Sequence, residues 1–244
     1  MPLSVDLTSD TFFNGRIHVS QPAEGYRFSL DAPLLAGHIS PGPDARIVDL
    51  GTGCGIIPLL LAHRHPTVQI TGFELQTRLA TIAMNNVKTN DMADCIAIVQ
   101  ADIHTVGHGK AGGKTDLVVC NPPFREARSG RINPDREKAI ARHEIAVTLT
   151  DIVAAASRLL RVGGEFAVIY PAVRLIDLVT AMRSAAIEPK QILTIHSKQG
   201  EDARLVIVKG LKNSRPGAIV LPPLVIYEND GKTYTSDVRA MLGV

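Results

Sequence analysis

The sequence contains no tryptophan and few aromatic residues of any kind, which make up 4% of its 244 residues. Hydrophobic residues still account for 45% of the chain, so we expect a buried core that is mostly aliphatic. The longest apolar run, residues 56–62, is far too short to cross a bilayer, and no signal peptide is visible at the N-terminus. These absences exclude a membrane-spanning class and predict a chain with no membrane partner.

Cysteine is also scarce. The chain has three cysteines, Cys54, Cys95 and Cys120, which are widely spaced and form no C-x-x-C pair. This odd, scattered set argues against a disulfide framework and a zinc site, so we predict no bound metal and a cytoplasmic location. Cys54 lies in a glycine-rich segment, where a small packing residue is a simpler interpretation than a redox group.

The chain length fits one α/β domain with a short appendage. Residues 1–30 are polar and rich in turn formers, and we interpret them as a small β-hairpin or cap packed on the core. Residues 31–244 then form a single domain. Its first helix is expected over residues 32–39, with Asp31 as the N-cap and a break at residues 41–43.

Short apolar strands alternate with amphipathic helices through most of the remaining chain. The expected strands cover 46–50, 68–73, 96–100, 117–120 and 165–170, and the expected helices cover 56–64, 77–90, 149–160 and 174–185. This alternation predicts an α/β, Rossmann-like fold with a mostly parallel twisted sheet and helices on both faces. The runs 191–196 and 205–209 predict an antiparallel C-terminal edge hairpin. Residues 219–244 add a strand and a short helix of no assigned role.

A glycine-rich turn follows the first expected strand of this alternation. Gly51, Gly53 and Gly55 occupy alternate positions after Asp49, which allows a tight turn and close approach of a ligand to the backbone. A nicotinamide fingerprint, G-x-G-x-x-G, would need a glycine where Ile56 stands. The spacing therefore favours a nucleotide-like cofactor without a pyrophosphate and disfavours NAD.

Two carboxylates end the next strands. Glu74 is placed to accept hydrogen bonds from both ribose hydroxyls of such a cofactor, and Asp102 to reach an adenine amino group. We assign Leu75 and Ile103, which follow them, to the same site. Taken alone, Glu74 is equally well a solvated strand-end charge, and Asp102 a helix or turn cap.

The segment Asn121-Pro122-Pro123-Phe124 ends the fourth of these strands. The Asn121 side-chain oxygen and the Pro122 carbonyl are two acceptors that can draw an amine nitrogen toward a nucleophilic geometry. The prolines stiffen the turn, and Phe124 offers a ring on which a base can stack. This chemistry suits methyl transfer from S-adenosylmethionine to an exocyclic or amide nitrogen, with all four residues catalytic and Asn121 also touching the cofactor. The alternative is an ordinary strand-ending turn.

The net charge of the chain is only +2, but cations concentrate directly after Phe124. Residues 125–142 hold three anions and six cations, which are Arg125, Arg128, Arg131, Arg136, Lys138 and Arg142. Such a segment can hold a polyanion through phosphate contacts, so we expect it to bind nucleic acid. A solvated charged face is the alternative.

Together these motifs resemble the "small domain" class I methyltransferases. More narrowly, the chain is similar to the bacterial tRNA(Val) N6-adenine methyltransferases that modify the anticodon loop. The narrower match rests on three further segments: residues 21–22 with 25–31, residues 141–144, and the ending, residues 224–227 with 234–235 and a final helix. The resemblance covers nearly the whole chain, and it implies that Asp31 lies near the methionine end of S-adenosylmethionine. It also implies that the glycines line the cofactor, while Glu74 holds its ribose and Asp102 its adenine.

One departure concerns Phe124, because tyrosine is commoner there in the tRNA branch and phenylalanine also occurs in guanine-N2 relatives. The open alternatives are therefore a guanine-N2 rRNA methyltransferase, a protein glutamine N5 methyltransferase and an RNA-binding protein that keeps the fold. The glutamine enzymes carry a helical domain ahead of this core, whereas only 46 residues precede Ile47 here. Neither the target RNA nor the oligomeric state follows from the sequence.

Overall fold

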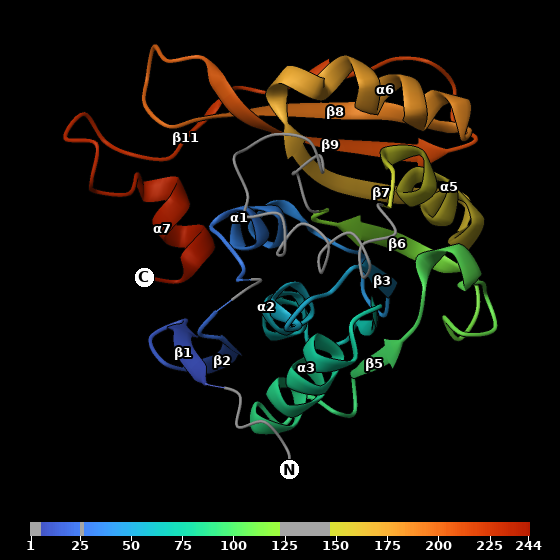
Figure 1. Ribbon diagram of the computed structural model, residues 1–244. Coiled ribbons are helices and arrows are strands. Elements are labelled where there is room, and N and C mark those ends of the chain that lie inside the picture. The colour runs from blue at the N-terminus through green and yellow to red at the C-terminus, as the bar shows by residue number, and fades with distance from the viewer. Residues whose placement is uncertain (1–5, 25–26, 123–146) are drawn as a thin grey trace, which may run out of the picture.

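A nine-stranded mixed sheet runs through the centre of the molecule, with helices against both of its faces (Figure 1). This computed structural model describes residues 6–24, 27–122 and 147–244. The strand order is β10-β8-β9-β7-β6-β3-β4-β5, and β11 pairs with β8 beyond this path. The α/β architecture and its mostly parallel order confirm the predicted fold class.

Five strands of the sheet are parallel neighbours in the order β7-β6-β3-β4-β5. They are β3 (Arg46–Leu50), β4 (Gln69–Glu74), β5 (Ile96–Gln100), β6 (Thr115–Cys120) and β7 (Leu160–Pro171). The antiparallel strand β9 (Ala203–Lys212) lies between β7 and β8 (Ile187–His196), which confirms the expected late hairpin. Two short strands were not foreseen as separate elements, β10 (Ile219–Val220) and β11 (Leu224–Val225), and both pair with β8 in parallel.

The helices cover the two faces of this sheet. They are α1 (Asp31–His38), α2 (Ile56–Arg64), α3 (Thr77–Thr89), α5 (Leu149–Leu159), α6 (Leu175–Ser184) and α7 (Ser236–Leu242), with 3-10 turns η1 (Ile103–Thr105) and η2 (Ala172–Arg174). Strand residues alternate between two buried clusters. Leu117 and Val119 join the cluster with α1 and α2, whereas Val118 and Cys120 join the cluster with α5 and α6. Solid apolar strands therefore result from burial on both faces.

The first helix begins differently from the prediction. Leu30, not Asp31, is the N-cap, and its backbone is already helical, with φ −55° and ψ −21°. The Leu34 N–H donates to the Leu30 carbonyl at 3.0 Å, so the first turn closes on Leu30. The expectation that Asp31 caps the helix is wrong, because Asp31 already lies within the first turn. There its carboxylate still lies near the positive end of the helix dipole.

The first residues form the hairpin β1 (Leu7–Phe12) and β2 (Ile17–Pro22), which is antiparallel. Two asparagines of α3 pair with the backbone of β2. Asn90 accepts from the His18 N–H at 2.8 Å and donates to its carbonyl at 2.7 Å, and Asn86 does the same to Ser20 at 2.9 and 2.8 Å. The Asn86 amide also donates to the Cys54 carbonyl at 2.9 Å. The hairpin is thereby joined to both α3 and the glycine-rich turn.

The last residues return to the start of the domain (Figure 1). Helix α7 packs on α1 so closely that a side-chain carbon at Gly37 would lie 2.6 Å from Met241. The Arg64 guanidinium, at the end of α2, donates to the Ala240 carbonyl at 3.1 Å and lies 5.1 Å from the Phe13 ring centre. This packing gives residues 219–244 a structural role that the sequence did not suggest. Within the described residues, no helix is long and apolar enough to span a membrane.

Candidate active site

The carboxyl ends of β6, β3, β4 and β5 lie side by side at one edge of the sheet (Figure 1). Register pairs Leu50 with Cys120, Leu50 with Phe73, and Glu74 with Gln100. The structure therefore brings together the glycine-rich turn, Glu74, Asp102 and Asn121, which lie far apart in the sequence. Ligands of open parallel sheets bind at such an edge.

The glycine-rich turn needs glycine at all three predicted positions. Gly51, Gly53 and Gly55 have φ values of +74°, +59° and +85°, which residues with a side chain rarely adopt. The N–H groups of Gly51 and Thr52 both donate to the Phe73 carbonyl at 2.9 Å, which fixes the turn to β4. A side-chain carbon at Gly51 would meet nothing within 4 Å, so the turn leaves open space on that side.

Glu74 is nearly buried, with 6% of its surface exposed. Its Oε2 accepts a hydrogen bond from the Gly53 N–H and its Oε1 one from the Gln76 N–H, both at 2.9 Å. Burial raises the pKa of Glu74, and the backbone hydrogen bonds from Gln76 and Gly53 oppose this effect. The carboxylate thus holds the glycine-rich turn in place, and each oxygen keeps a second lone pair for a ligand. Its ribose contact stays a prediction.

Asp49 lies beneath the turn and is fully buried. Burial raises its pKa to about 7, the Thr52 hydroxyl opposes the shift, and the charge of Glu74 adds to it. Neither Asp49 carboxylate oxygen nor the Thr52 hydroxyl has a partner of hydrogen-bond geometry in the part of the chain that the structure describes. Buried polar atoms without partners are costly, so these groups fit a polar ligand that supplies donors. The methionine end of S-adenosylmethionine carries such groups.

A hydrophobic residue directly follows each of the two strand-end carboxylates, Leu75 after Glu74 and Ile103 after Asp102. Leu75 is 41% exposed, which is high for leucine, and Ile103 is buried. Asp102 is the N-cap of η1, and its Oδ1 accepts from the His104 N–H at 2.9 Å. The cap alternative for Asp102 is therefore realised, and its contact with adenine stays a prediction. Exposed Leu75 is suited to contact a flat ring.

Asp31 is half-buried in the first turn of α1. Burial raises its pKa, and the Ser29 hydroxyl lowers it. No hydrogen bond joins it to the glycine-rich turn among the described residues, so its predicted place near the methionine end is not shown. Cys54, inside the turn, is buried, and burial raises its pKa to about 12. Its thiol is therefore protonated at neutral pH, as expected of a packing residue.

The predicted catalytic turn begins where β6 ends. Asn121 is half-buried and Pro122 is buried. Cys120 at the end of β6 pairs with Leu50 at the end of β3. The next residues along the two strands, Asn121 and Gly51, are therefore neighbours. Pro123, Phe124 and the six predicted nucleic-acid-binding cations lie outside the described residues. The site is therefore described on the cofactor side and at the first two residues of the turn.

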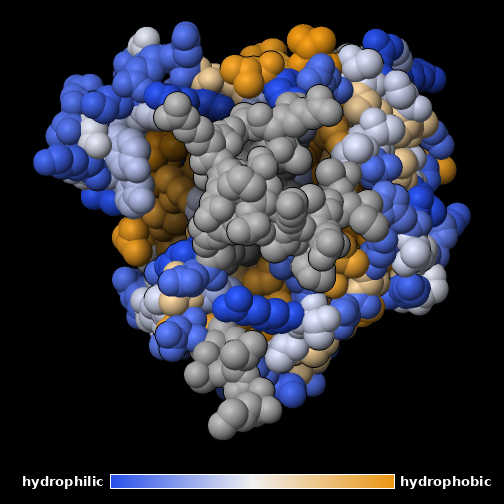
Figure 2. All heavy atoms as spheres, viewed as in Figure 1, coloured by the Kyte–Doolittle hydropathy of each residue, from blue (hydrophilic) through white to orange (hydrophobic). Residues whose placement is uncertain are grey.

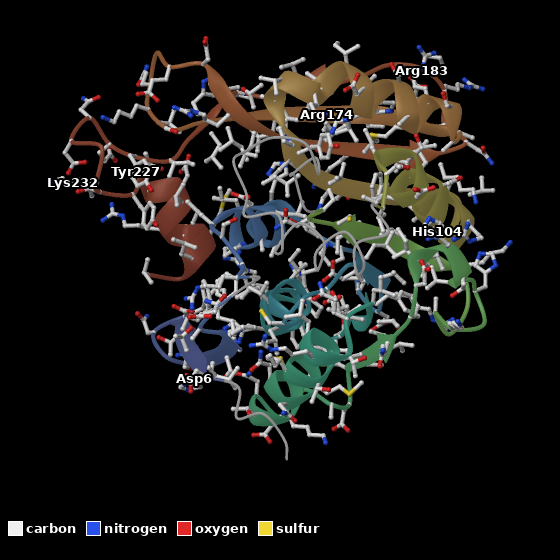
Figure 3. The ribbon with its side chains drawn as sticks, viewed as in Figure 1. Asp6, His104, Arg174, Arg183, Tyr227 and Lys232 are labelled. Atoms are coloured by element: carbon white, nitrogen blue, oxygen red, sulfur yellow. The ribbon has the colours of Figure 1, made fainter. Side chains whose placement is uncertain are left out.

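The end of the neighbouring strand β7, with η2 and the start of α6 that follow it, contributes a rim to this edge. The Arg174 guanidinium lies 5.3 Å from the ring centre of Tyr170, and Val173 and Ile176 are 91% and 76% exposed. Figure 3 places Arg174 at the near end of α6, and Figure 2 shows apolar surface above it, where α6 lies. This rim was not predicted, since an exposed valine and isoleucine leave no local pattern in the sequence.

His104 and Thr52 were also missed. Both touch predicted site residues: Thr52, inside the glycine-rich turn, touches Asp49 but was assigned no role of its own, and His104 touches Asp102 but belongs to no predicted motif. In the described ranges, no three histidine, cysteine or acidic side chains are grouped so as to hold a metal ion.

The fold is shared with solved methyltransferases. A protein described as a predicted O-methyltransferase from Agrobacterium tumefaciens superposes with a TM-score of 0.69 at 24% identity, over 86% of this chain and 94% of that one. A geranyl diphosphate C-methyltransferase from Streptomyces coelicolor gives a TM-score of 0.53 at 16% identity, over 74% and 78%. The [4+2]-cyclase SpnF gives 0.56 at 14% identity, over 74% and 80%. These likenesses show the fold alone.

Sequence comparison is more specific. A curated tRNA1(Val) (adenine(37)-N6)-methyltransferase from Porphyromonas gingivalis is 34% identical over 178 residues, which are 70% of this chain and 69% of that protein. A protein of the same name from Aeromonas hydrophila is 26% identical over 210 residues, covering 84% and 86%. The model of the methyltransferase small domain family matches residues 28–183. The chain therefore belongs to the methyltransferase small domain family.

Proposed function

We propose that this methyltransferase transfers the methyl group of S-adenosylmethionine to N6 of an adenine in tRNA. The observation that carries the proposal is the register of β3 and β6, which sets Asn121 beside the glycine-rich turn. The acceptor for an amine and the cradle for the cofactor are thus adjacent. The names of the relatives from Porphyromonas gingivalis and Aeromonas hydrophila support the same substrate class.

The cofactor, when bound, supplies an electrophilic methyl group. The protein's part is to hold and orient. Glu74 holds the glycine-rich turn through its hydrogen bond to the Gly53 N–H, and there is free space for a ligand beside Gly51. The Asp49 oxygens, which have no partner among the described residues, can accept hydrogen bonds from the cofactor. Exposed Leu75 offers an apolar wall to the adenine ring. These groups position the methyl donor, and alignment of two reactants accounts for much of the rate in such reactions.

Asn121 acts on the other reactant. The lone pair of an exocyclic adenine nitrogen is delocalised into the ring, so the nitrogen is a weak nucleophile. The amino group donates one hydrogen bond to the Asn121 side-chain oxygen and the other to the Pro122 carbonyl. These two hydrogen bonds favour a tetrahedral nitrogen. Acceptors fixed in advance stabilise the charge that develops during transfer. The product ammonium then loses a proton to solvent, and no strong base is required.

The tRNA part of the proposal rests on charge as well as on the relatives. The six cations between Arg125 and Arg142 follow the catalytic turn directly in the sequence. Strand β7 is the neighbour of β6 in the sheet, and η2 and α6, which follow β7, present the exposed Val173 and Ile176, against which unstacked bases can pack. A single-stranded loop is the form of RNA in which an amino group is accessible to such a site.

The test is incubation of the chain with labelled S-adenosylmethionine and, separately, total tRNA, bulk protein or DNA, followed by nucleoside or amino-acid analysis. We expect label in N6-methyladenosine of tRNA, and about 10²–10³-fold slower labelling with the Asn121→Ala variant. Label in N2-methylguanosine or in glutamine would replace the substrate and keep the methyltransferase. Absence of label in every substrate, with a folded protein, would contradict the proposal.

A further inference from the structure

His104 bridges two carboxylates that come from different parts of the chain. Its Nδ1 lies 2.6 Å from Oδ1 of Asp102 at the end of β5, and its Nε2 lies 3.5 Å from Oδ2 of Asp151 in the first turn of α5. The backbone N–H of His104 donates to the same Asp102 Oδ1 at 2.9 Å. Figure 3 shows the side chain at the junction of these two elements.

The bridge leaves one Asp102 oxygen available. Both donors from His104 reach Oδ1, and none of the described residues donates to Oδ2. The side chain of Asp102 is 34% exposed, so a ligand can reach part of it. A carboxylate fixed through one oxygen can rotate little, which orients the other.

The two elements that His104 joins are held together by other contacts as well. Arg158 of α5 donates to the carbonyls of Ile103 and Val106, each at 2.8 Å. Asp151 accepts from the Thr148 N–H at 2.9 Å and completes a capping box. Contacts other than the His104 side chain thus join η1 to α5. The His104 ring can therefore be replaced to test its effect on Asp102.

We propose that His104 is a positioning residue, which holds Asp102 so that its free oxygen accepts the adenine amino group of the cofactor. The inference rests on the proposed function, because it takes S-adenosylmethionine as the ligand. It goes beyond that function in making adenine recognition depend on a side chain that itself touches no cofactor. Loss of the imidazole leaves only the backbone N–H of residue 104 on Oδ1, so the Asp102 side chain gains freedom to rotate, and binding then has to restrict it again.

The arrangement also predicts a dependence on pH. The charged groups around the ring are Asp102, Asp151, Arg158 and Lys110, which reaches Thr105 at 3.3 Å. Hydrogen bonding to Asp102 raises the pKa of His104, and burial opposes this. Below its pKa the imidazolium of His104 donates to both carboxylates; as pH rises through that pKa, the ring loses its charge and keeps a proton on only one nitrogen. Affinity for the cofactor should fall over that interval.

Calorimetry with S-adenosylhomocysteine and with S-inosylhomocysteine, which has an oxygen in place of the amino group, tests the assignment. Near pH 6 we expect His104→Ala to lose about tenfold in affinity for the adenosyl ligand, the effect of one charge-assisted hydrogen bond. Affinity for the inosyl ligand should not change. Asp151→Asn keeps an oxygen for Thr148 and should move the decline in affinity to lower pH. His18→Ala removes an exposed histidine of the hairpin and serves as the matched control.

The outcomes separate this inference from the proposed function. If wild-type protein binds neither ligand, both fail. If it binds S-adenosylhomocysteine while His104→Ala keeps the same affinity or the same adenosyl preference, only the positioning role is overturned. Thermal melting of each variant checks the fold, and His104→Asn, which restores a donor near Oδ1, should recover most of the adenosyl preference.

Discussion

Glu74 and Asp102 lie at the carboxyl ends of neighbouring strands: Glu74 is the last residue of β4, and Asp102 lies two residues after β5 ends. Their surroundings differ sharply. Glu74 is 6% exposed, and both of its oxygens accept backbone N–H groups, whereas the Asp102 side chain is 34% exposed and uses one oxygen for His104. Both were expected to hold the same ligand.

The difference separates two tasks that a strand-end carboxylate can have. Glu74 holds the backbone that forms the site, so its removal acts on the fold and on binding together. In the proposed site Asp102 belongs to the surface that the cofactor covers, so we expect its removal to act on binding alone. Burial and the identity of the donors, more than position along the sheet, decide between the two tasks.

The largest effect is expected for Glu74→Ala. It leaves the N–H groups of Gly53 and Gln76 without their partner, at about 1–3 kcal/mol each, and should lower the free energy of unfolding accordingly. Urea denaturation measures this, with Glu74→Gln as a control that keeps one acceptor oxygen. An unchanged midpoint in the alanine variant would make Glu74 equivalent to Asp102 and end the comparison.

Asn121→Ala extends the comparison to a third strand end, that of β6. Single-turnover methylation of tRNA should slow by about 10²–10³-fold, by analogy with the loss of one preorganised oxyanion-hole donor. Affinity for S-adenosylhomocysteine should hold, because the asparagine oxygen matters most when the nitrogen changes geometry. Near wild-type turnover would remove the basis for amine chemistry at this turn.

Asp49 sharpens the comparison, because it is as buried as Glu74 but lacks its partners. Its pKa rises from 3.8 to about 7 in the folded protein, so the unfolded chain ionises first as pH increases. Folding therefore loses stability between these two pKa values, and Asp49→Asn avoids that loss. The free energy of unfolding of Asp49→Asn, relative to that of wild type at the same pH, should therefore be about 2 kcal/mol higher near pH 8 than near pH 5. Equal gains at both pH values would show that Asp49 is ionised in the fold.

The smallest effect is expected for Asp102→Asn. The amide keeps an oxygen for His104 but loses the charge, so affinity for S-adenosylhomocysteine should fall by about tenfold at most. The free energy of unfolding should stay within about 0.5 kcal/mol of wild type, as for exposed positions. Isothermal calorimetry and urea denaturation on the same preparation give both quantities. A loss of stability like that of Glu74→Ala would contradict the distinction.

Local patterns predicted the elements well where one segment determines its own structure. The strand at 46–50, the helix at 56–64 and the strand at 96–100 have the predicted bounds, because apolar runs and glycine breaks suffice to set them. The shared edge of β3, β4, β5 and β6 followed from the parallel order alone.

Contacts between distant segments were not predictable in this way. The His104 bridge to Asp151 spans the whole interval that holds the basic segment, and a histidine two residues after an aspartate has no distinctive pattern. Leu30 replaced Asp31 as the helix cap because backbone geometry decided the start, not side-chain preference. Partners of this kind depend on how elements pack, and a single sequence does not encode them locally.

The asparagine pair on α3 has a consequence for the order in which the protein assembles. A two-stranded hairpin is at best marginally stable by itself, and the outer edge of β2 finds its hydrogen-bond partners in Asn86 and Asn90. The hairpin therefore gains its structure only after α3 exists, and in hydrogen exchange its amides should open before those of the sheet. Because the Asn86 amide also donates to the Cys54 carbonyl, opening of the hairpin should also loosen the glycine-rich turn.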